Sequence, residues 1–569
     1  MKISLVGPSY TLQSVVAAAQ QTMNWYPETL AVADEPRRQV FFGRPGLKFF
    51  ANLVPGKIRC MWTGGGRLFV IHNGTQSEVF QDATHTASPK TVLEGSGNPD
   101  PAQIFSNGHQ LLVISGGQAY CDNGAGPDPI LFSITGTASA PGGTNLITRL
   151  TGPPFDPAWT NKTLRFDGQF YHIDGVPVTV PAGQTMLVTP NPPAVPEGVW
   201  QVAGGAPLDA ITGGILDGYF IVGRMPSSNP ALQAQGRTFN ISQLNEGAYW
   251  DPLDFGVKEG YSDVLRSVLC DHEELWLFGT VTTEVWTNIG STVDSAGVAT
   301  FPFQRMAGAF IQDGSSATFA PCSVGPYTCW LGGGTDGQTV AYRALAFQPE
   351  RISTHAQEED WNAPGFNVKD AVSFCYLDAG HLFWVVNFWA QQQTWVYDMT
   401  EGQWHERAGW NPVTNQFTRY QPWFHVFIPE WGVGGKHIVG DPTTGNLYEQ
   451  SLNYYDDDGA AIEYIRCFPH LLNEDKNLFH HRIEIYMETG AVQNPTPPLQ
   501  VGLDWSDNRG HTFGDARTIQ LAGAPGEYTK RIVWRRLGRS RDRVYRLGVN
   551  GRSKVALTDA FLEVTPGTS

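Results

Sequence analysis

Charged residues are scarce in this 569-residue sequence, where Asp, Glu, Lys and Arg together make up 16% of the chain. An ordinary soluble domain has roughly 25%. Acidic residues outnumber basic residues by 54 to 38, and the formal net charge is −16. A general nucleic-acid-binding protein needs clustered Lys and Arg to neutralise phosphates. This composition disfavours that class, so any contact with DNA must be local.

Cysteine and long apolar runs are also limited. Seven cysteines are scattered without CxxC spacing, which favours a reducing compartment over a disulfide framework. No apolar stretch approaches the ~18 residues of a membrane span. Near the N-terminus, Gly7 and Pro8 interrupt the short apolar run before a signal peptide could form. We expect a protein made in a cytoplasm, with no membrane segment.

Catalytic signatures are missing. The sequence has no GxSxG elbow, no Walker A loop and no HExxH motif. Three consecutive acids at 456–458 could suggest calcium, but neighbouring side chains point in different directions, and a solvated turn is the favoured interpretation. The histidines lack metal-ligand spacing. We therefore expect no enzyme activity, no cofactor and no metal.

Glycine (63 residues), proline (39) and aromatic residues (12%, with 18 Trp) are abundant. Frequent Gly and Pro indicate many turns, and the chain is predicted to be all-β. Abundant Trp and Tyr with little charge suit large protein interfaces.

One pattern recurs along the chain: a short apolar strand, a Gly-rich or polar turn, and a second strand with an aromatic residue or Val. Its copies lie at 67–82, 110–124, 218–224, 274–288, 329–344, 381–407 and 436–450. Their starts follow one period of about 45 to 55 residues if the long gap after 124 holds an insertion, and strand repeats of this length are typical of propeller blades. We predict a β-propeller of six or seven blades. The alternative is a set of unrelated hairpins in a large sandwich.

The predicted propeller occupies 51–151 and 209–455. Pro-rich borders mark off 152–208, which we interpret as a small β module inserted in a blade loop. After 455 the hairpin rhythm stops, and longer strands over 456–569 predict a C-terminal β-sandwich-like domain. Residues 1–50 are assigned to an N-terminal arm and first strands. Only 13–21 (QSVVAAAQQ) has clear helical propensity.

Two regions carry a family resemblance. They are QTMNWYPETLAV (21–32) with FFGRPGLKFF (41–50), and EYTKRIVWRRLGRSRDRVYRLGV (527–549). Together with the hairpins between them, they resemble the packaged-DNA-stabilisation, or tail hub (nozzle), proteins of short-tailed bacteriophages. The most recognisable pattern of that family falls on Lys530, Arg531, Val533, Trp534, Arg535, Arg536, Gly538 and Arg539.

The resemblance implies a structural protein of the virion tail. Such a protein would form a homo-oligomeric ring of six that docks on the adaptor ring below the portal. It would extend and seal the DNA channel, retain packaged DNA, and carry a distal needle, fibre or spike. Contact with DNA would be transient. The shorter members of the family have no counterpart of 152–208, so the resemblance implies nothing about partners of that module.

Basic residues concentrate at the second resemblance region, where ten of the 38 lie within 530–554. Strand alternation would place Arg535, Arg539, Arg541 and Arg543 on one face, and Arg pairs bidentately with carboxylates or phosphates. We expect contacts with a neighbouring subunit or the adaptor; a channel face meeting DNA and a merely solvated face remain open. The candidate contact residues are Arg535, Arg536, Arg539, Arg541, Arg543 and Arg546.

Residues 506–513 (SDNRGHTF) match the Asp-box pattern found on propeller hairpins of sialidases. Asx side chains bond nearby backbone groups, and Gly accepts positive φ. We therefore interpret Ser506, Asn508, Gly510 and Thr512 as a structural turn rather than a carbohydrate site.

The alternative function is a carbohydrate-active or carbohydrate-binding propeller, such as a sialidase-like tail protein. Tryptophans in 384–395 and 409–412 could stack on sugars, although strand Trp often fills a blade core. A single Asp box outside the repeats favours structure over catalysis.

Overall fold

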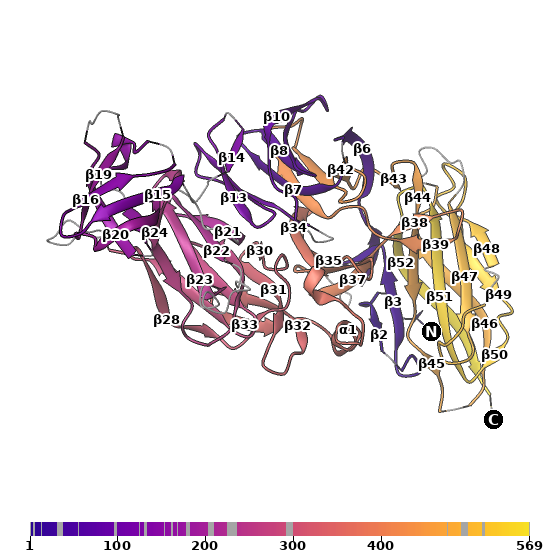
Figure 1. Ribbon diagram of the computed structural model, residues 1–569. Coiled ribbons are helices and arrows are strands. Elements are labelled where there is room, and N and C mark those ends of the chain that lie inside the picture. The colour runs from indigo at the N-terminus through magenta and orange to yellow at the C-terminus, as the bar shows by residue number, and fades with distance from the viewer. Residues whose placement is uncertain are drawn as a thin grey trace.

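In the computed structural model, a β-barrel, a β-propeller and a β-sandwich follow one another along an elongated body (Figure 1). Both chain ends lie at the sandwich. The structure describes all residues except 1, 4–5, 13, 31–37, 55, 96–99, 125, 130–133, 153, 161–162, 168, 178–182, 203–209, 225–235, 292–299, 475, 491–498, 515–517 and 568–569.

The propeller has seven blades, each built from antiparallel strands that follow one another in the sheet. The strands of the first three blades are β7 (Ile58–Gly64), β8 (Arg67–His72), β9 (Thr75–Val79) and β10 (His85–Thr91); β11 (Gln103–Ser106), β12 (Leu111–Ser115), β13 (Gln118–Asp122) and β14 (Pro127–Pro129); β21 (Ala210–Leu216), β22 (Tyr219–Arg224), β23 (Thr238–Gln243) and β24 (Glu246–Val257). Six of the seven predicted copies supply the second and third strands of a blade, and the copy at 218–224 supplies the second strand alone, β22; the predicted propeller is confirmed.

The later blades continue the pattern. Their strands are β25 (Leu265–Asp271), β26 (Glu274–Gly279), β27 (Thr283–Asn288) and β28 (Phe303–Ile311); β29 (Gly314–Ser315), β30 (Cys322–Val324), β31 (Tyr327–Gly333), β32 (Thr339–Leu345) and β33 (Gln348–Arg351); β34 (Val372–Asp378), β35 (His381–Phe388), β36 (Gln393–Asp398) and β37 (Gln403–Arg407); β40 (Phe424–Ile428), β41 (Lys436–Gly440) and β42 (Asn446–Ser451). A small hairpin, β38 (Gly409–Asn411) and β39 (Gln416–Thr418), separates the last two blades.

The seventh blade is completed by the N-terminal part of the chain. Strand β6 (Gly46–Asn52) pairs with β42 as its fourth strand, and β40 contacts β7 of the first blade. The ring is thereby closed by two distant segments. Hydrophobic cores fill the spaces between neighbouring blades, for example the cluster that joins Phe69 of the first blade to Val113 of the second. Burial of these apolar faces is the main favourable term for the propeller.

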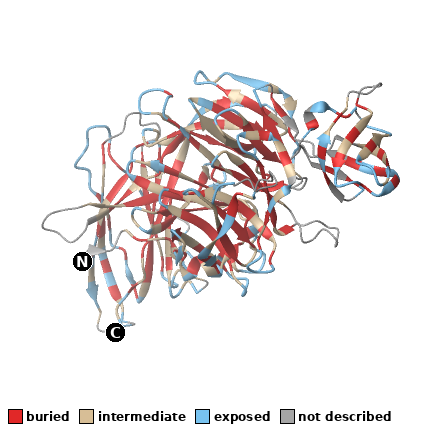
Figure 2. Ribbon diagram, turned by 90° about the vertical axis from the view of Figure 1, so that its left-hand side faces the viewer, coloured by how far each residue is buried: buried red, intermediate tan, exposed pale blue. Residues whose placement is uncertain are grey.

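The barrel lies between the second and third blades. Its six strands close in the order β15-β16-β19-β18-β17-β20. They are β15 (Ile134–Pro141), β16 (Leu146–Arg149), β17 (Thr163–Phe166), β18 (Gln169–Gly175), β19 (Thr185–Thr189) and β20 (Ala194–Val202), with the short helix η1 (Pro157–Trp159). Its buried cluster contains barrel residues alone, including Trp200 and Phe166, and Figure 2 shows it as a separate lobe. The inserted unit thus begins before 152, because β15 and β16 close the barrel.

Replacing 134–202 by a short Gly/Ser linker is expected to leave a soluble, cooperatively melting propeller and sandwich. The two attachment points are close, because Pro129 pairs with Tyr120 while the Ala210 amide bonds to the Gly117 carbonyl. Tyr120 and Gly117 are three residues apart, which corresponds to ~10 Å along a strand. A linker of about six residues is therefore long enough to join the two attachment points. Thermal melting of the purified variant checks this. A variant that lacks 152–208 should aggregate instead, because β15 and β16 then lose the other four strands of the barrel. If both deletion variants behave alike, the boundary of the inserted unit before 152 is wrong.

The sandwich combines both ends of the chain in two sheets. One sheet contains β1 (Lys2–Ile3), β4 (Trp25–Leu30), β5 (Arg38–Gly43), β46 (Leu478–Met487), β49 (Ile532–Arg535), β50 (Arg539–Ser540) and β52 (Ala556–Pro566). The other contains β2 (Tyr10–Thr11), β3 (Ala19–Met23), β43 (Asp456–Asp457), β44 (Ala460–Cys467), β45 (Leu471–Leu472), β47 (Gln500–Ser506), β48 (Thr518–Leu521) and β51 (Asp542–Gly551). Trp25 and Phe41 from the N-terminal strands are fully buried in its core.

The expected helix is not formed over 14–21, the described part of that segment, because 19–23 pairs as β3 with β44 and bridges β37. Tertiary pairing overrides the local propensity there. A helix, α1 (His355–Trp361), lies instead between the fifth and sixth blades, followed by η3 (Val368–Asp370). Thr354 and Gln357 form its capping box, and Trp361 is buried in the core between these blades. None of the helices in the described ranges has the length and hydrophobicity of a membrane span.

Candidate assembly surface on the sandwich

The six predicted contact arginines fall into two groups. Two of them, Arg543 and Arg546, form ion pairs within the sandwich. The other four are exposed: Arg535, Arg536, Arg539 and Arg541. The prediction that Arg543 shares a face with the exposed arginines is wrong. Its strand β51 lies in the second sheet, and its side chain is only 2% exposed.

Arg543 forms a bidentate ion pair with Asp507, with Nε–Oδ1 and Nη2–Oδ2 distances of 2.6 and 2.8 Å. Its Nη1 group also donates to the Leu537 carbonyl, and the guanidinium lies 5.0 Å from the centre of the Trp505 ring. Burial alone would lower the pKa of Arg543, but the bonds to Asp507 and Tyr545 leave this pKa raised. Arg543 therefore stays charged and holds the fold of the sandwich.

Arg546 is the other internal arginine. It stands directly opposite Asp504 in the β47–β51 pair, and its Nη2 lies 2.6 Å from the Asp504 carboxylate. The guanidinium stacks 4.3 Å from the centre of the Phe513 ring. Asp504 and Asp507 were missed by sequence reasoning. Their acidic side chains were the only signal in the sequence, and strand pairing decides which arginine each one meets.

We call the four exposed residues Arg535, Arg536, Arg539 and Arg541 the arginine surface. They lie on the connection from β49 through β50 to β51, and β50 is close to the C-terminus at the end of the molecule opposite the barrel (Figure 1). Within the described part of the chain, no ion pair satisfies any of them. Arg536 and Arg539 line one shallow depression with Phe479 and His481.

The backbone below this surface is held by local geometry. Arg536 has a φ of 60° and Gly538 a φ of 79°, so the connection turns sharply after β49. The amide of Arg536 bonds to the His481 carbonyl at 2.9 Å, and the amide of His480 bonds to the Gly538 carbonyl at 2.8 Å. This turn presents neighbouring arginines to solvent in a fixed arrangement.

His480 supports the turn from inside. Its Nε2 lies 2.9 Å from the Ser540 hydroxyl and its Nδ1 3.0 Å from the Tyr545 hydroxyl. Burial, together with the nearby Arg543 guanidinium, lowers the pKa of His480 to about 4. The imidazole is therefore neutral near pH 7.

The four residues of the Asp-box pattern form a closed turn between β47 and β48. The Ser506 hydroxyl donates to Asn508 Oδ1 at 2.7 Å and accepts from the Gly510 amide at 2.9 Å. Asn508 Oδ1 also accepts from the Thr512 amide at 2.9 Å, and the Asn508 amide group donates to the Thr512 hydroxyl at 2.7 Å. Gly510 has a φ of 90°. The side-chain polar groups of Ser506, Asn508 and Thr512 are therefore directed into the turn itself.

Other candidates from the sequence have structural partners. Asp457 is buried against Arg44, and Asp456 and Asp458 accept backbone hydrogen bonds. Across the described residues, no group of three or more His, Cys, Asp or Glu side chains is placed to hold a metal ion. Trp384 and Trp395, considered for sugar stacking, lie in the core between the fifth and sixth blades.

Comparison with known families gives two matches. A model described as the β-propeller of bacteriophage P22 Gp10 matches residues 198–453, and a model described as the β-sandwich of the same protein matches 463–565. The chain is thus a phage tail structural protein built on a β-propeller. Over both of these domains the chain is similar to Gp10. The first two blades and the barrel precede both matches, except for the end of β20.

The solved structures that match this chain are only distantly similar to it. AztD from Citrobacter koseri is 11% identical with a TM-score of 0.30, covering 74% of this chain and 87% of its own. The Pan2 WD40 domain from Neurospora crassa is 11% identical with a TM-score of 0.25, covering 72% and 95%. At these scores neither likeness bears on the fold or function of this chain. Comparison with curated proteins found no match.

Proposed function

We propose that this protein is a non-enzymatic tail hub subunit that assembles into a ring of six below the portal–adaptor complex. In this role it extends and seals the DNA channel, retains the packaged genome, and carries a distal needle, fibre or spike. The arginine surface binds carboxylates of the ring neighbour or of the adaptor. The matches to the Gp10 propeller and sandwich support a tail position.

The observation that carries the proposal is the contrast between paired and unpaired arginines in one domain. Arg531 and Arg482 of the same region pair with Glu484 and Glu563, whereas the arginine surface has no ion-pair partner in the described chain. The rest of the protein is strongly acidic, with a net charge of −16. Copies of this chain therefore offer carboxylates, which Arg binds in a planar, bidentate way.

Changing Arg535, Arg539 and Arg541 together to Ala tests the proposal. The variant is expected to fold normally, because these side chains are exposed and exposed substitutions typically change stability by within ~0.5 kcal/mol each. Particles made with it should lack the subunit and lose their DNA. Folding is measured as the melting temperature of the purified chain. Assembly is measured as the amounts of this subunit and of DNA in purified particles.

A matched control removes three exposed basic side chains elsewhere, Lys48, Arg305 and Lys369, and should leave particles intact. Normal incorporation of the arginine variant with DNA retained would show a solvated surface. Normal incorporation with leakage of DNA would assign these arginines to the channel instead of to a protein partner.

A further inference from the structure

Three cysteines gather where the fifth and sixth blades meet. Cys322 lies in β30 and Cys329 in β31, directly opposite one another in an antiparallel pair. Cys375 lies in β34, the innermost strand of the next blade. All three are free thiols, and none of the family or sequence features above assigns them a role.

The register of the two inner strands brings Cys322 and Cys375 together. β30 and β34 contact each other, and a parallel bridge joins Phe319 to Val372 just before them. Each cysteine follows its bridged residue by three positions, so the two stand at the same level. The Ser323 carbonyl oxygen accepts a hydrogen bond from both thiols, at 3.5 Å from Cys322 Sγ and 3.0 Å from Cys375 Sγ.

The environment differs among the three thiols. Cys322 and Cys375 are partly exposed, whereas Cys329 is fully buried. When Cys375 loses its proton, the Cys322 thiol can turn from the Ser323 carbonyl and donate to the Cys375 thiolate, which lowers the pKa of Cys375 below its ordinary value; the same bond and burial raise the pKa of Cys322. Cys375 is therefore the more readily ionised thiol, and the thiolate is the attacking species in disulfide exchange.

We propose that Cys322 and Cys375 are an oxidisable pair that forms a disulfide between the fifth and sixth blades in an oxidising medium. The oxidant is a low-molecular-weight disulfide such as oxidised glutathione. The Cys375 thiolate attacks it, forms a mixed disulfide and releases one glutathione thiolate, which takes up a proton. The Cys322 thiol then loses its proton, attacks the Cys375 sulfur and releases the second glutathione. This inference is independent of the arginine surface.

The link would tie adjacent inner strands of the propeller. It would close a loop that contains the outer strands of the fifth blade and α1, and cross-links across such loops stabilise chiefly by restricting the unfolded chain. A chain made in a reducing cytoplasm would stay reduced there, and would acquire the link after release. The expected consequence is a higher melting temperature, reversed by dithiothreitol.

The test uses the purified full-length chain with reduced or oxidised glutathione, followed by alkylation, trypsin digestion and mass spectrometry. Cys322 and Cys329 share the tryptic peptide 306–343, and Cys375 lies in 370–407. Oxidised protein should yield these two peptides joined, two hydrogen masses below their sum. The joined peptide should disappear in Cys322→Ser and in Cys375→Ser, and remain in Cys329→Ser.

Two outcomes would overturn the proposal. One is continued alkylation of both thiols, or a glutathione adduct on Cys375 that never closes, in oxidised wild-type protein. The other is a joined peptide that survives Cys322→Ser and disappears in Cys329→Ser. Counting free thiols in the folded wild-type chain before and after oxidation tests the proposal without a variant. Two thiols should be lost on oxidation, while the buried cysteines Cys60, Cys121 and Cys467 stay reduced.

Discussion

Replacing Asp457 by Ala is expected to lower the free energy of unfolding by about 3 to 5 kcal/mol, because it leaves a buried guanidinium without its counter-charge. Arg44 and Asp457 form a bidentate pair with distances of 2.6 and 2.9 Å, and their side chains are 0% and 4% exposed. Burial alone would lower the pKa of Arg44, but the Asp457 carboxylate leaves it raised. Without Asp457 the guanidinium would still be charged, because an arginine side chain keeps its proton in proteins.

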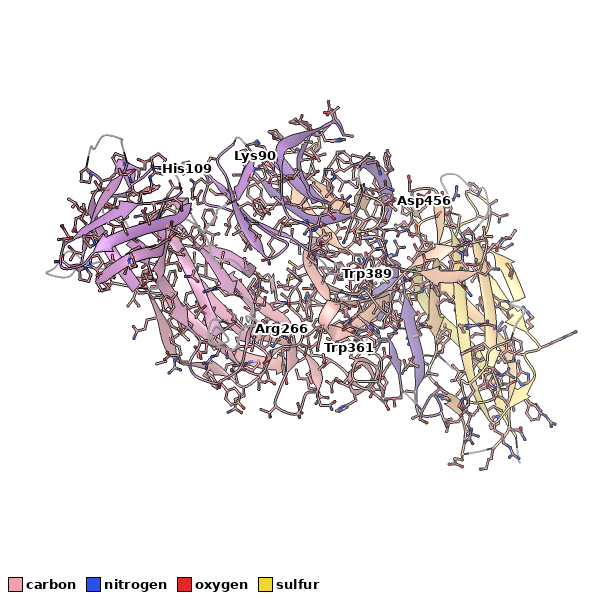
Figure 3. All side chains as sticks on the ribbon, viewed as in Figure 1. Lys90, His109, Arg266, Trp361, Trp389 and Asp456 are labelled. Carbon is pink, nitrogen blue, oxygen red and sulfur yellow. The ribbon has the colours of Figure 1, made fainter. Side chains whose placement is uncertain are left out.

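The position of this pair explains why the effect should be global. Arg44 also donates to Asn24 Oδ1 at 2.9 Å and to the Ala408 carbonyl at 3.1 Å. It thus joins the N-terminal strands, the end of the sixth blade and the start of the sandwich. The neighbouring Asp456, labelled in Figure 3, lies at this junction. Loss of the pair should loosen propeller and sandwich together.

Urea denaturation of the full chain measures the effect, with Asp456→Ala as the matched control. Asp456 accepts one bond from the Gly459 amide at 3.1 Å, so its loss should cost about 1 kcal/mol. Adding Arg44→Met to Asp457→Ala should cost less than Arg44→Met alone, since the charge is then already unpaired. Equal losses for Asp456→Ala and Asp457→Ala would contradict the assigned role of the pair.

Stability is expected to fall steeply between pH 6.5 and 4.5. Burial lowers the pKa of His425 to about 3 and that of His480 to about 4. Below its ordinary pKa each histidine takes up a proton in the unfolded chain but not in the folded one. The stability contribution is therefore complete above pH 6.5 and is lost as pH falls. Each histidine contributes ~1.4 kcal/mol per pH unit in this range.

An opposing group lies in the third blade. Burial raises the pKa of Asp254 to about 6, so its folded form gains a proton before the unfolded form and offsets part of the loss. The effect of a histidine can be measured separately from this offset at His480 in the sandwich. The charged groups that face His480 are Arg543, Asp507 and His481, and Asp254 is not among them. Protonation of His480 would place a second cation beside Arg543.

His480→Gln should therefore flatten the dependence of unfolding free energy on pH by about 1.4 kcal/mol per unit between pH 6.5 and 4.5. Glutamine retains hydrogen-bonding capacity toward Ser540 and Tyr545 but does not titrate. Urea denaturation at several pH values gives the slopes, and His85→Gln, at an exposed position, is the control. A slope unchanged by His480→Gln, with the fold intact, would refute the buried neutral state.

The amino-acid sequence by itself determined the local features of this protein. Six of the seven predicted hairpins became the second and third strands of a blade, because their two strands and the turn are contiguous in the chain; at 218–224 the sequence predicted only the second strand. The turn at 506–512 also formed as expected, since Asn508 and Gly510 supply its bonds and its positive φ within one short segment.

Tertiary structure alone decided the pairings between distant segments. The addition of β6 to the seventh blade and of β3 to the sandwich joins residues about 400 positions apart, and no local pattern encodes such partners. The same holds for the first two barrel strands, which were assigned to a blade. The arginines were divided in the same way: Arg543 and Arg546 met Asp507 and Asp504 across strands. Strand pairing buried Arg543, partly buried Arg546 and left their neighbours exposed, because a run of like residues acquires different environments only when the sheets assemble.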